Sequence, residues 1–155
     1  SLSRRSSWPD HQPDASALGA DVWLGDSMGE MGLYYRLANI VLMGGSLIEH
    51  GGQNPLEAAR LDAALLFGPH MFNFTDQADV MIDSGGAVVV TGVEDLVEHV
   101  ALLLSDGAEV DRRAKAAAAA ADDGHDVVAA ILQQLAPLLP DQRQRQPQGN
   151  SRAGA

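Results

Sequence analysis

The sequence predicts an α/β protein in which a parallel β-sheet carries helices on both faces. Four short apolar segments alternate with stretches of helical periodicity, and glycines directly follow three of these segments. Parallel strands need a crossover connection, usually a helix, so this alternation favours a parallel sheet over a series of hairpins. Ligands of such open sheets bind beyond the carboxyl ends of the strands. We therefore expect a site across the three glycine loops.

Composition narrows the classes of function. The chain has 155 residues, of which 46% are hydrophobic, enough for one domain with a buried core. The net charge of −11 and the single lysine argue against a nucleic-acid or anionic-membrane surface. The lack of cysteine excludes disulfides and zinc–thiolate sites. No apolar run approaches the roughly 20 residues of a membrane-spanning helix.

The N-terminal stretch has little periodicity. Residues 1–20 are polar and contain two prolines, so we predict a short start at Leu2–Ser6 followed by a loop. Val22–Leu24 is an apolar run that ends at a glycine, which predicts a buried strand. Apolar residues at i, i+1 and i+4 predict a helix over 30–37. The chain begins without methionine, and we expect it to be a piece of a longer protein.

A helix start follows the second strand. Asn54 is predicted as the N-cap, Pro55 lies in the first turn, and Glu57 is the third residue after the cap, the pattern of a capping box. This helix should run to about residue 62. Apolar runs predict strands at 39–43, 64–67 and 87–90. Helical patterns predict helices at 74–83, 93–104, 108–121 and 126–139. Residues 140–155 lack apolar periodicity and are predicted to be disordered.

The glycine-rich stretch between the second strand and this helix is the main candidate site. A strand that stops at paired glycines, then a glycine loop and a capped helix, is how α/β proteins build a nucleotide-phosphate site. With one lysine in the chain, backbone amides would hold most of the phosphate charge. The candidates are Gly45, Ser46, His50, Gly51, Gly52, Gln53, Asn54 and Glu57, together with Gly29, Glu30 and Met31 of the first loop.

Several of these residues have two interpretations. Glu57 either completes the capping box or binds a ligand, and for Asn54 the cap is favoured over direct ligand contact. His50 is either a solvated loop histidine or a donor to an anion. For His70 and Asn73, after the third strand, turn and cap chemistry is slightly favoured over ligand binding. The histidines and carboxylates show no metal-ligand spacing, so we predict no metal and no cofactor.

The charged and aromatic residues in and around the first glycine loop are assigned structural roles. Glu30 is interpreted as a charge that interacts favourably with the helix N-terminus, whose amides would bind a base or phosphate. Arg4 and Arg5 are interpreted as solvated charges. Tyr34 and Tyr35 are interpreted as core and helix-packing residues.

Five longer motifs resemble the bacterial 3-deoxy-D-manno-octulosonic acid (Kdo) transferases. They are Arg4–Ser6, Leu24–Ala38, Gly44–Leu47, His50–Glu57 and Gly68–Phe74, in this order. The resemblance covers residues 4–105 and extends weakly into the helices beyond. It implies a Rossmann-like fold, part of the C-terminal domain of a GT-B glycosyltransferase, with 21–139 as an incomplete nucleotide-sugar-binding domain.

The resemblance also implies a function. These enzymes transfer Kdo from CMP-Kdo to a lipid A precursor (lipid IVA) in lipopolysaccharide biosynthesis, at the cytoplasmic face of the inner membrane. Glu57 would bind the ribose hydroxyls of the donor. The general base, the acceptor site and the membrane anchor would belong to an N-terminal part, so no catalytic residue is expected here and the chain alone should be inactive.

Two departures from the family pattern stand out. Glu49 lies where the family usually has proline, and it adds negative charge beside an anion site. Asp62 replaces a glycine before the third strand. Two other functions stay open: a GT-B transferase that uses a UDP-sugar, and a noncatalytic nucleotide-binding domain. A preference for CMP over other nucleotides would distinguish them.

Overall fold

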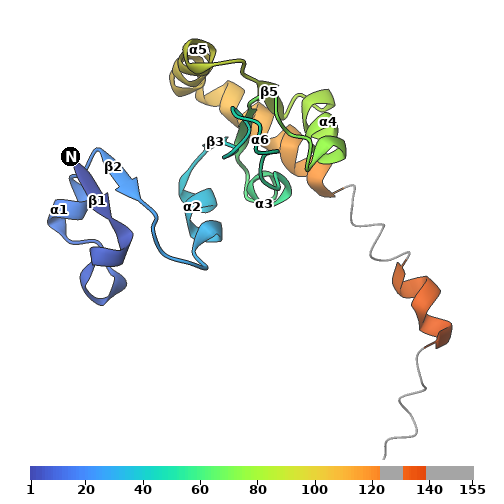
Figure 1. Ribbon diagram of the computed structural model, residues 1–155, viewed down its shortest axis with the longest axis horizontal. Helices are drawn as coiled ribbons and strands as arrows, with labels where there is room; N and C mark the ends of the chain where they lie inside the picture. The colour runs from blue at the N-terminus through green and yellow to red at the C-terminus, as the bar shows by residue number, and fades with distance from the viewer. Residues whose placement is uncertain (123–130, 139–155) are drawn as a thin grey trace, which may run out of the picture. The chain divides into compact units, whose positions relative to one another are not determined.

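The protein is described here by a computed structural model, which covers residues 1–122 and 131–138 (Figure 1). The chain divides into two units, Ser1–Asp123 and Gly124–Ala155. In the second unit the described residues are helical over 131–135 and continue into a 3-10 turn, Ala136–Leu138. The first part of the helix predicted at 126–139 and the predicted tail, 140–155, lie outside the described residues.

The strands pair in parallel, as the sequence predicts, and they form two sheets. β3 (Ile40–Leu42), β4 (Ala64–Phe67) and β5 (Ala87–Val89) form a three-stranded sheet with β4 in the centre. In its register, Val41 lies beside Leu65 and Leu65 beside Ala87. β1 (Leu2–Arg4) and β2 (Val22–Leu24) form a separate two-stranded sheet.

Two predictions for the N-terminal stretch are wrong. β1 lies within the predicted start, but the residues after it are not a loop, because they contain two 3-10 turns and α1 (Ala15–Leu18). β2 is not buried, because it pairs with β1 and all three of its residues are exposed. Side chains order this stretch: Asp14 Oδ1 accepts from Ala17 N at 2.8 Å, and Trp23 Nε1 donates to Ala17 O at 2.7 Å.

The predicted helices are present, with small changes in their bounds. They are α2 (Met31–Leu37), α3 (Leu56–Ala59), α4 (Thr75–Asp83), α5 (Val93–Ser105) and α6 (Gly107–Asp122). α3 is shorter than predicted, because the chain turns at Asp62, whose φ is 61°. Among the described residues, none of the helices combines the length and the apolar character that crossing a bilayer requires.

The core consists of one apolar cluster on each face of the three-stranded sheet. All four residues of β4 are buried, and successive side chains point to opposite faces. Leu65 and Phe67 belong to a cluster with residues of α3, α4 and α6. Ala64 and Leu66 belong to a second cluster, which includes residues of α5. The predicted parallel sheet with helices on both faces is therefore confirmed for these three strands.

Candidate functional site

The segments that follow β3 and β4 are hydrogen-bonded to each other beyond the ends of the strands. We call them the glycine loop (residues 43–53) and the β4 loop (residues 68–74). His70 N donates to Ser46 O at 2.9 Å, and Asn73 N donates to Gly51 O at 3.2 Å. Two of the three predicted loops thus lie together, at the end of the sheet where open α/β folds bind ligands.

Gly51 lies at one of the tight points of this contact. Its φ is 97°, a conformation that side chains rarely adopt, and a Cβ there would clash with Asn73 Nδ2. The same Nδ2 atom donates to His50 O at 3.2 Å. Asn73, for which turn and cap chemistry was slightly favoured, therefore bonds to the glycine loop through both its side chain and its backbone.

His50 is exposed to solvent, and its ring lies over Gly45. A Cβ on Gly45 would be 2.8 Å from His50 Cδ2, so the ring and the backbone are in contact. Gly52 N donates to Gly45 O at 3.3 Å and closes the loop beneath the ring. Gln53 is exposed beside it. This arrangement leaves both interpretations of His50 open.

Asn54 and Glu57 do not form the predicted capping box, because the residue at the N-cap of α3 is Pro55 and not Asn54. Asn54 Oδ1 accepts from Leu56 N at 3.0 Å, so Asn54 does bond an amide of the first turn of α3. Glu57 is exposed, and within the described residues its carboxylate has no hydrogen bond or ion pair. It lies close enough to α2 to raise the pKa of Tyr35, whose burial is the larger cause of that rise.

The length of α3 changes the physical argument for anion binding. With four residues, the helix is too short to produce a large macrodipole. An anion at this site would therefore depend on the amides of the glycine loop more than on the helix.

The first loop forms polar contacts with the N-terminal stretch. Arg5 Nη2 lies 2.5 Å from Glu30 Oε1, and Ser27 donates to the other oxygen of the same carboxylate. Arg5 is 7% exposed and its guanidinium lies over the Trp8 ring, so its interpretation as a solvated charge is wrong. Local periodicity could not reveal this pair, because 25 residues separate the partners.

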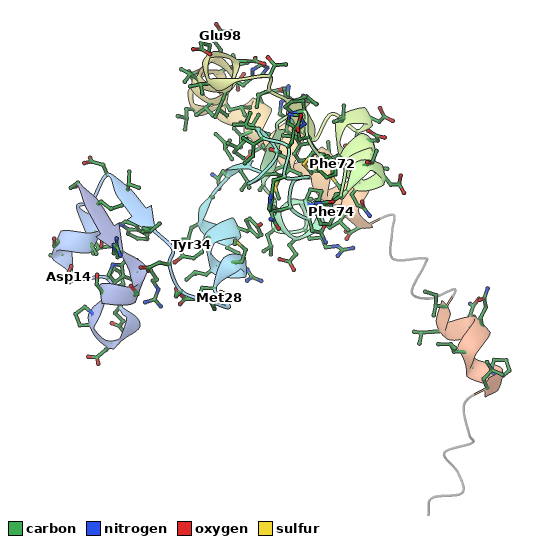
Figure 2. All side chains as sticks on the ribbon, in the orientation of Figure 1. Asp14, Met28, Tyr34, Phe72, Phe74 and Glu98 are labelled. Atoms are coloured by element: carbon green, nitrogen blue, oxygen red, sulfur yellow. The ribbon has the colours of Figure 1, made fainter. Side chains whose placement is uncertain are left out.

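Both neighbours of Glu30 are exposed. Gly29, with a φ of 83°, and Met31, 55% exposed, lie on either side of it. Figure 2 shows Met28 and Tyr34 near the two ends of this region. Tyr34 is half-buried and packs against Gly25, where a Cβ would lie 2.7 Å from Tyr34 Cζ, which agrees with its interpretation as a packing residue.

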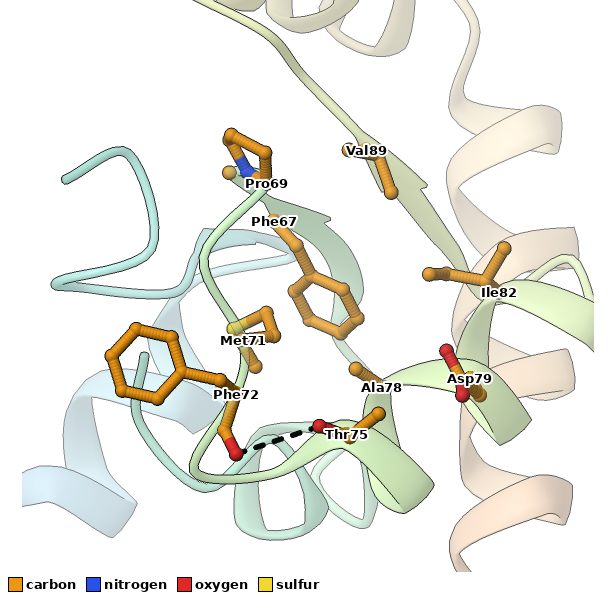
Figure 3. A pocket seen from close by; sticks show the side chains of 10 residues that line it. Phe67, Pro69, Met71, Phe72, Thr75, Ala78, Asp79, Ile82 and Val89 are labelled. Atoms are coloured by element: carbon orange, nitrogen blue, oxygen red, sulfur yellow. Dashed lines mark hydrogen bonds between the residues drawn. The ribbon is translucent and has the colours of Figure 1, made fainter. Parts of the chain in front are cut away.

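An open pocket of about 380 Å³ lies between the β4 loop, α4 and β5 (Figure 3). Its lining includes Phe67, Met71, Phe72, Thr75, Asp79, Ile82 and Val89. None of the predicted site residues lines it. The lining is mainly apolar and its one charged residue is an aspartate, so it does not suit a phosphate. The apolar residues on both sides of the Gly-Pro pair were the sequence signal that could have indicated it.

The search for a metal centre covers residues 1–122 and 131–138. Within them, no three histidine, aspartate or glutamate side chains are grouped closely enough to hold a metal ion.

Comparisons with known proteins identify similar sequences. No family-wide sequence profile matches the chain. Proteins named 3-deoxy-D-manno-octulosonic acid transferase do match: that of Bordetella pertussis is 37% identical over 99 residues, and that of Haemophilus influenzae is 37% identical over 92 residues. The alignments cover 64% and 59% of this chain, but 23% and 22% of the relatives. The chain thus spans less than a quarter of the length of these relatives.

A solved structure is similar in fold as well as in sequence. It is the crystal structure of the C-terminal CMP-Kdo binding domain of WaaA from Acinetobacter baumannii, with a TM-score of 0.67 and 30% identity. The match covers 77% of this chain and 60% of that chain. The fold class predicted from the sequence is confirmed. In sequence and in fold, the chain is similar to the C-terminal part of the bacterial Kdo transferases, as its motifs predict.

Proposed function

We propose that this chain binds the nucleotide of CMP-Kdo and acts as the donor-binding part of a Kdo transferase. The observation that carries the proposal is its similarity to a CMP-Kdo binding domain over 77% of its residues. The joined glycine and β4 loops support it, because they lie where ligands of open α/β sheets bind.

Each group of the proposed site has a chemical task. The amides of Gly51 and Gln53 bind the phosphate, while the Gly52 amide closes the loop by donating to Gly45 O. His50 donates to the phosphate or to the carboxylate of Kdo. Glu57 accepts hydrogen bonds from the two ribose hydroxyls, which suits a carboxylate with two free oxygens. Its exposure and its lack of a hydrogen-bond partner in the described part of the chain support this role. The bond from Leu56 N to Asn54 fixes the start of α3 and thereby the position of Glu57.

The first loop completes the proposed site. The amides of Gly29 and Met31 bind the base or the phosphate. The ion pair of Glu30 with Arg5 supports this, because it offsets the negative charge that would otherwise repel an anionic ligand.

In the proposed reaction, a hydroxyl of the lipid A precursor attacks the anomeric carbon of Kdo. The bond from that carbon to the CMP phosphate oxygen breaks, and loop amides stabilise the charge that develops on the departing phosphate. A general base takes the proton of the hydroxyl. We place that base, the acceptor site and the attachment to the cytoplasmic face of the inner membrane outside these 155 residues. The chain by itself should therefore transfer no Kdo.

Calorimetric titration with CMP and UMP tests the proposal. We expect the chain to bind CMP weakly and to prefer it to UMP. Equal affinity for both nucleotides would favour a different nucleotide-sugar donor, and no binding of either at millimolar concentration would favour a noncatalytic domain.

The variant Glu57→Gln tests the site itself. It should weaken CMP binding by about tenfold, the loss expected for one charge-assisted contact. The free energy of unfolding should change by less than about 1 kcal/mol, because the side chain is exposed. Glu98→Gln removes the same charge from an exposed position on α5 and should change neither quantity. A drop in stability with unchanged CMP affinity would make Glu57 a structural residue.

A further inference from the structure

Ser46 is the one residue of the glycine loop whose polar side chain is fully buried. Its Oγ donates to Met43 O at 2.6 Å and accepts from Gly68 N at 2.7 Å. Its carbonyl oxygen also accepts from His70 N at 2.9 Å. Ser46 is 0% exposed, so water cannot easily replace a lost partner. The hydroxyl therefore joins the end of β3 to the start of the β4 loop, and it is not directed at a ligand.

Gly68 contributes the other side of this contact. Its backbone approaches Ser46 so closely that a Cβ would clash with the Ser46 carbonyl group. Gly68 is buried as well. The close approach of the two backbones thus requires glycine at position 68 and a small hydroxyl side chain at position 46. The contact between the two loops therefore depends on the residue type at both positions.

A second connection lies at the other end of the glycine loop. Asn73 bonds to His50 O through its side chain and to Gly51 O through its backbone amide, both at 3.2 Å. Asn73 is exposed, so water competes for these bonds, whereas the bonds of Ser46 are shielded. Of the two connections, the one at Ser46 should hold the loop more firmly.

We propose that Ser46 is a positioning residue of the donor site. Its buried hydroxyl fixes the glycine loop against the β4 loop, and this sets the direction of the amides at Gly51 and Gln53. The role of Ser46 in ligand binding rests on the proposed function, but its role in holding the loop does not. Preorganised amides bind an anion more tightly, because the loop loses less freedom when the ligand arrives.

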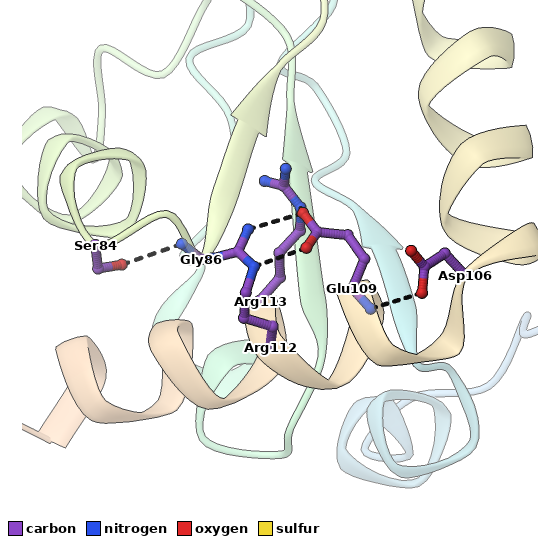
Figure 4. Close-up of polar contacts among 6 residues, drawn as sticks. All are labelled: Ser84, Gly86, Asp106, Glu109, Arg112 and Arg113. Atoms are coloured by element: carbon purple, nitrogen blue, oxygen red, sulfur yellow. Dashed lines mark hydrogen bonds and ion pairs between the residues drawn. The ribbon is translucent and has the colours of Figure 1, made fainter.

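The chain offers a matched control for removal of this hydroxyl. Ser84, at the end of α4, makes the same pair of bonds: its Oγ donates to Met81 O at 2.9 Å and accepts from Gly86 N at 3.2 Å. Figure 4 shows the bond between Ser84 and Gly86. Ser46→Ala and Ser84→Ala therefore remove the same pair of bonds. They differ in that Ser84 is exposed and lies outside the two loops.

Hydrogen–deuterium exchange of the full 155-residue chain, without nucleotide, tests the positioning role. Ser46→Ala should speed the exchange of peptides from 43–53 and 68–74 by about tenfold, whereas Ser84→Ala should leave them unchanged. Equal effects of the two variants on these peptides, or no effect of Ser46→Ala, would overturn the proposal. If Ser46→Ala unfolds the chain, Ser46→Cys, which keeps the shape but donates weakly, should speed exchange in these two loops and not in α5.

CMP titration of the same variants tests the consequence for binding. Ser46→Ala should weaken CMP binding by about tenfold, and Ser84→Ala by less than about twofold. If the wild-type chain binds no CMP, the proposed function fails and the exchange result alone decides the positioning role. If Ser46→Ala loosens the loop but leaves CMP affinity unchanged, this loop does not hold the phosphate and the inference is wrong.

Discussion

The three-stranded sheet and the N-terminal segment, residues 1–24, are both built on parallel strands, yet different forces hold them. β4 is fully buried between two apolar clusters, whereas every residue of β2 is exposed. The N-terminal segment instead relies on polar and aromatic contacts, such as Arg5 with Glu30 and the edge-to-face pair of Trp8 and Trp23 at 4.9 Å. Stability should therefore be uneven along the chain, with the N-terminal segment opening first.

Two probes can follow the regions separately. Both tryptophans of the chain, Trp8 and Trp23, lie in the N-terminal segment, so tryptophan fluorescence reports on that segment. Far-UV circular dichroism reports mainly on the helices, most of which pack on the three-stranded sheet. In urea, we expect the fluorescence change to precede the loss of ellipticity. Coincident transitions would mean that the two regions unfold as one unit.

The largest contrast should come from shortening one leucine in each region. Leu65→Ala, at a fully buried position of β4, should lower the free energy of unfolding by about 2–5 kcal/mol. Leu24→Ala, at a position of β2 that is 41% exposed, should lower it by less than about 1 kcal/mol. Urea titrations of both variants measure the difference. Similar losses would show that the apolar contacts of β2 matter as much as the core.

The next largest effect should come from the buried cation of the N-terminal segment. Arg5→Met removes the partly buried ion pair with Glu30 and the contact of the guanidinium with the Trp8 ring, and we expect a loss of about 1–3 kcal/mol. Arg4→Met, at the exposed neighbouring position, should change stability by less than about 0.5 kcal/mol. The loss should appear in the fluorescence transition. If Arg5→Met shifts only the circular dichroism transition, the pair does not belong to a separately stable segment.

Acid should weaken the helical region through Glu109 of α6. Two hydrogen bonds from Arg112, together with the charge of Arg113, lower the pKa of Glu109 from 4.5 to about 2 (Figure 4). A lowered pKa in the folded state stabilises it above pH 4.5, and this contribution is lost as the pH falls from 4.5 towards 2. Glu109→Gln should therefore flatten the decline of stability in this range. An unchanged slope would exclude Glu109 as a cause of the decline.

The smallest expected effect is an increase in stability. Asp62, after α3, has a φ of 61°, a conformation that glycine adopts without strain. Asp62→Gly should raise the free energy of unfolding by about 0.5–1 kcal/mol. Asp79→Gly, within α4, should lower it by up to about 1 kcal/mol. Thermal melts of the two variants should shift in opposite directions. A loss with Asp62→Gly would mean that its side chain contributes more than the strain costs.

The two regions also differ in how well their elements could be predicted from the sequence. β4 was predicted at its observed residues, 64–67. Its apolar run indicates burial, and the Gly-Pro pair that follows indicates a turn at its end. The end of α4 was predicted because Gly85, with a φ of 76°, is a common helix terminator. Such signals are local. They describe the elements of the three-stranded sheet well.

Contacts between polar residues that are far apart in the sequence produce no local sequence pattern. The residues between the predicted start at Leu2–Ser6 and the strand at Val22–Leu24 were predicted as a loop. Their short turns show no hydrophobic period, and the sequence near Arg5 does not indicate a partner 25 residues away. In the candidate site, the glycine loop was identified from its composition. The inward direction of the Ser46 hydroxyl depends on the approach of Gly68, 22 residues away, which only the fold reveals.

The most direct test of the proposed donor site is to measure by NMR which amide signals of the ¹⁵N-labelled chain shift when CMP is added. We predict that CMP shifts the amide signals of Gly45, Gly51, Gly52 and Gln53 along a single binding curve, and that UMP produces smaller shifts at the same concentration. Signals confined to the apolar pocket at Phe67, Ile82 and Val89, or shifts of equal size with both nucleotides, would contradict the account.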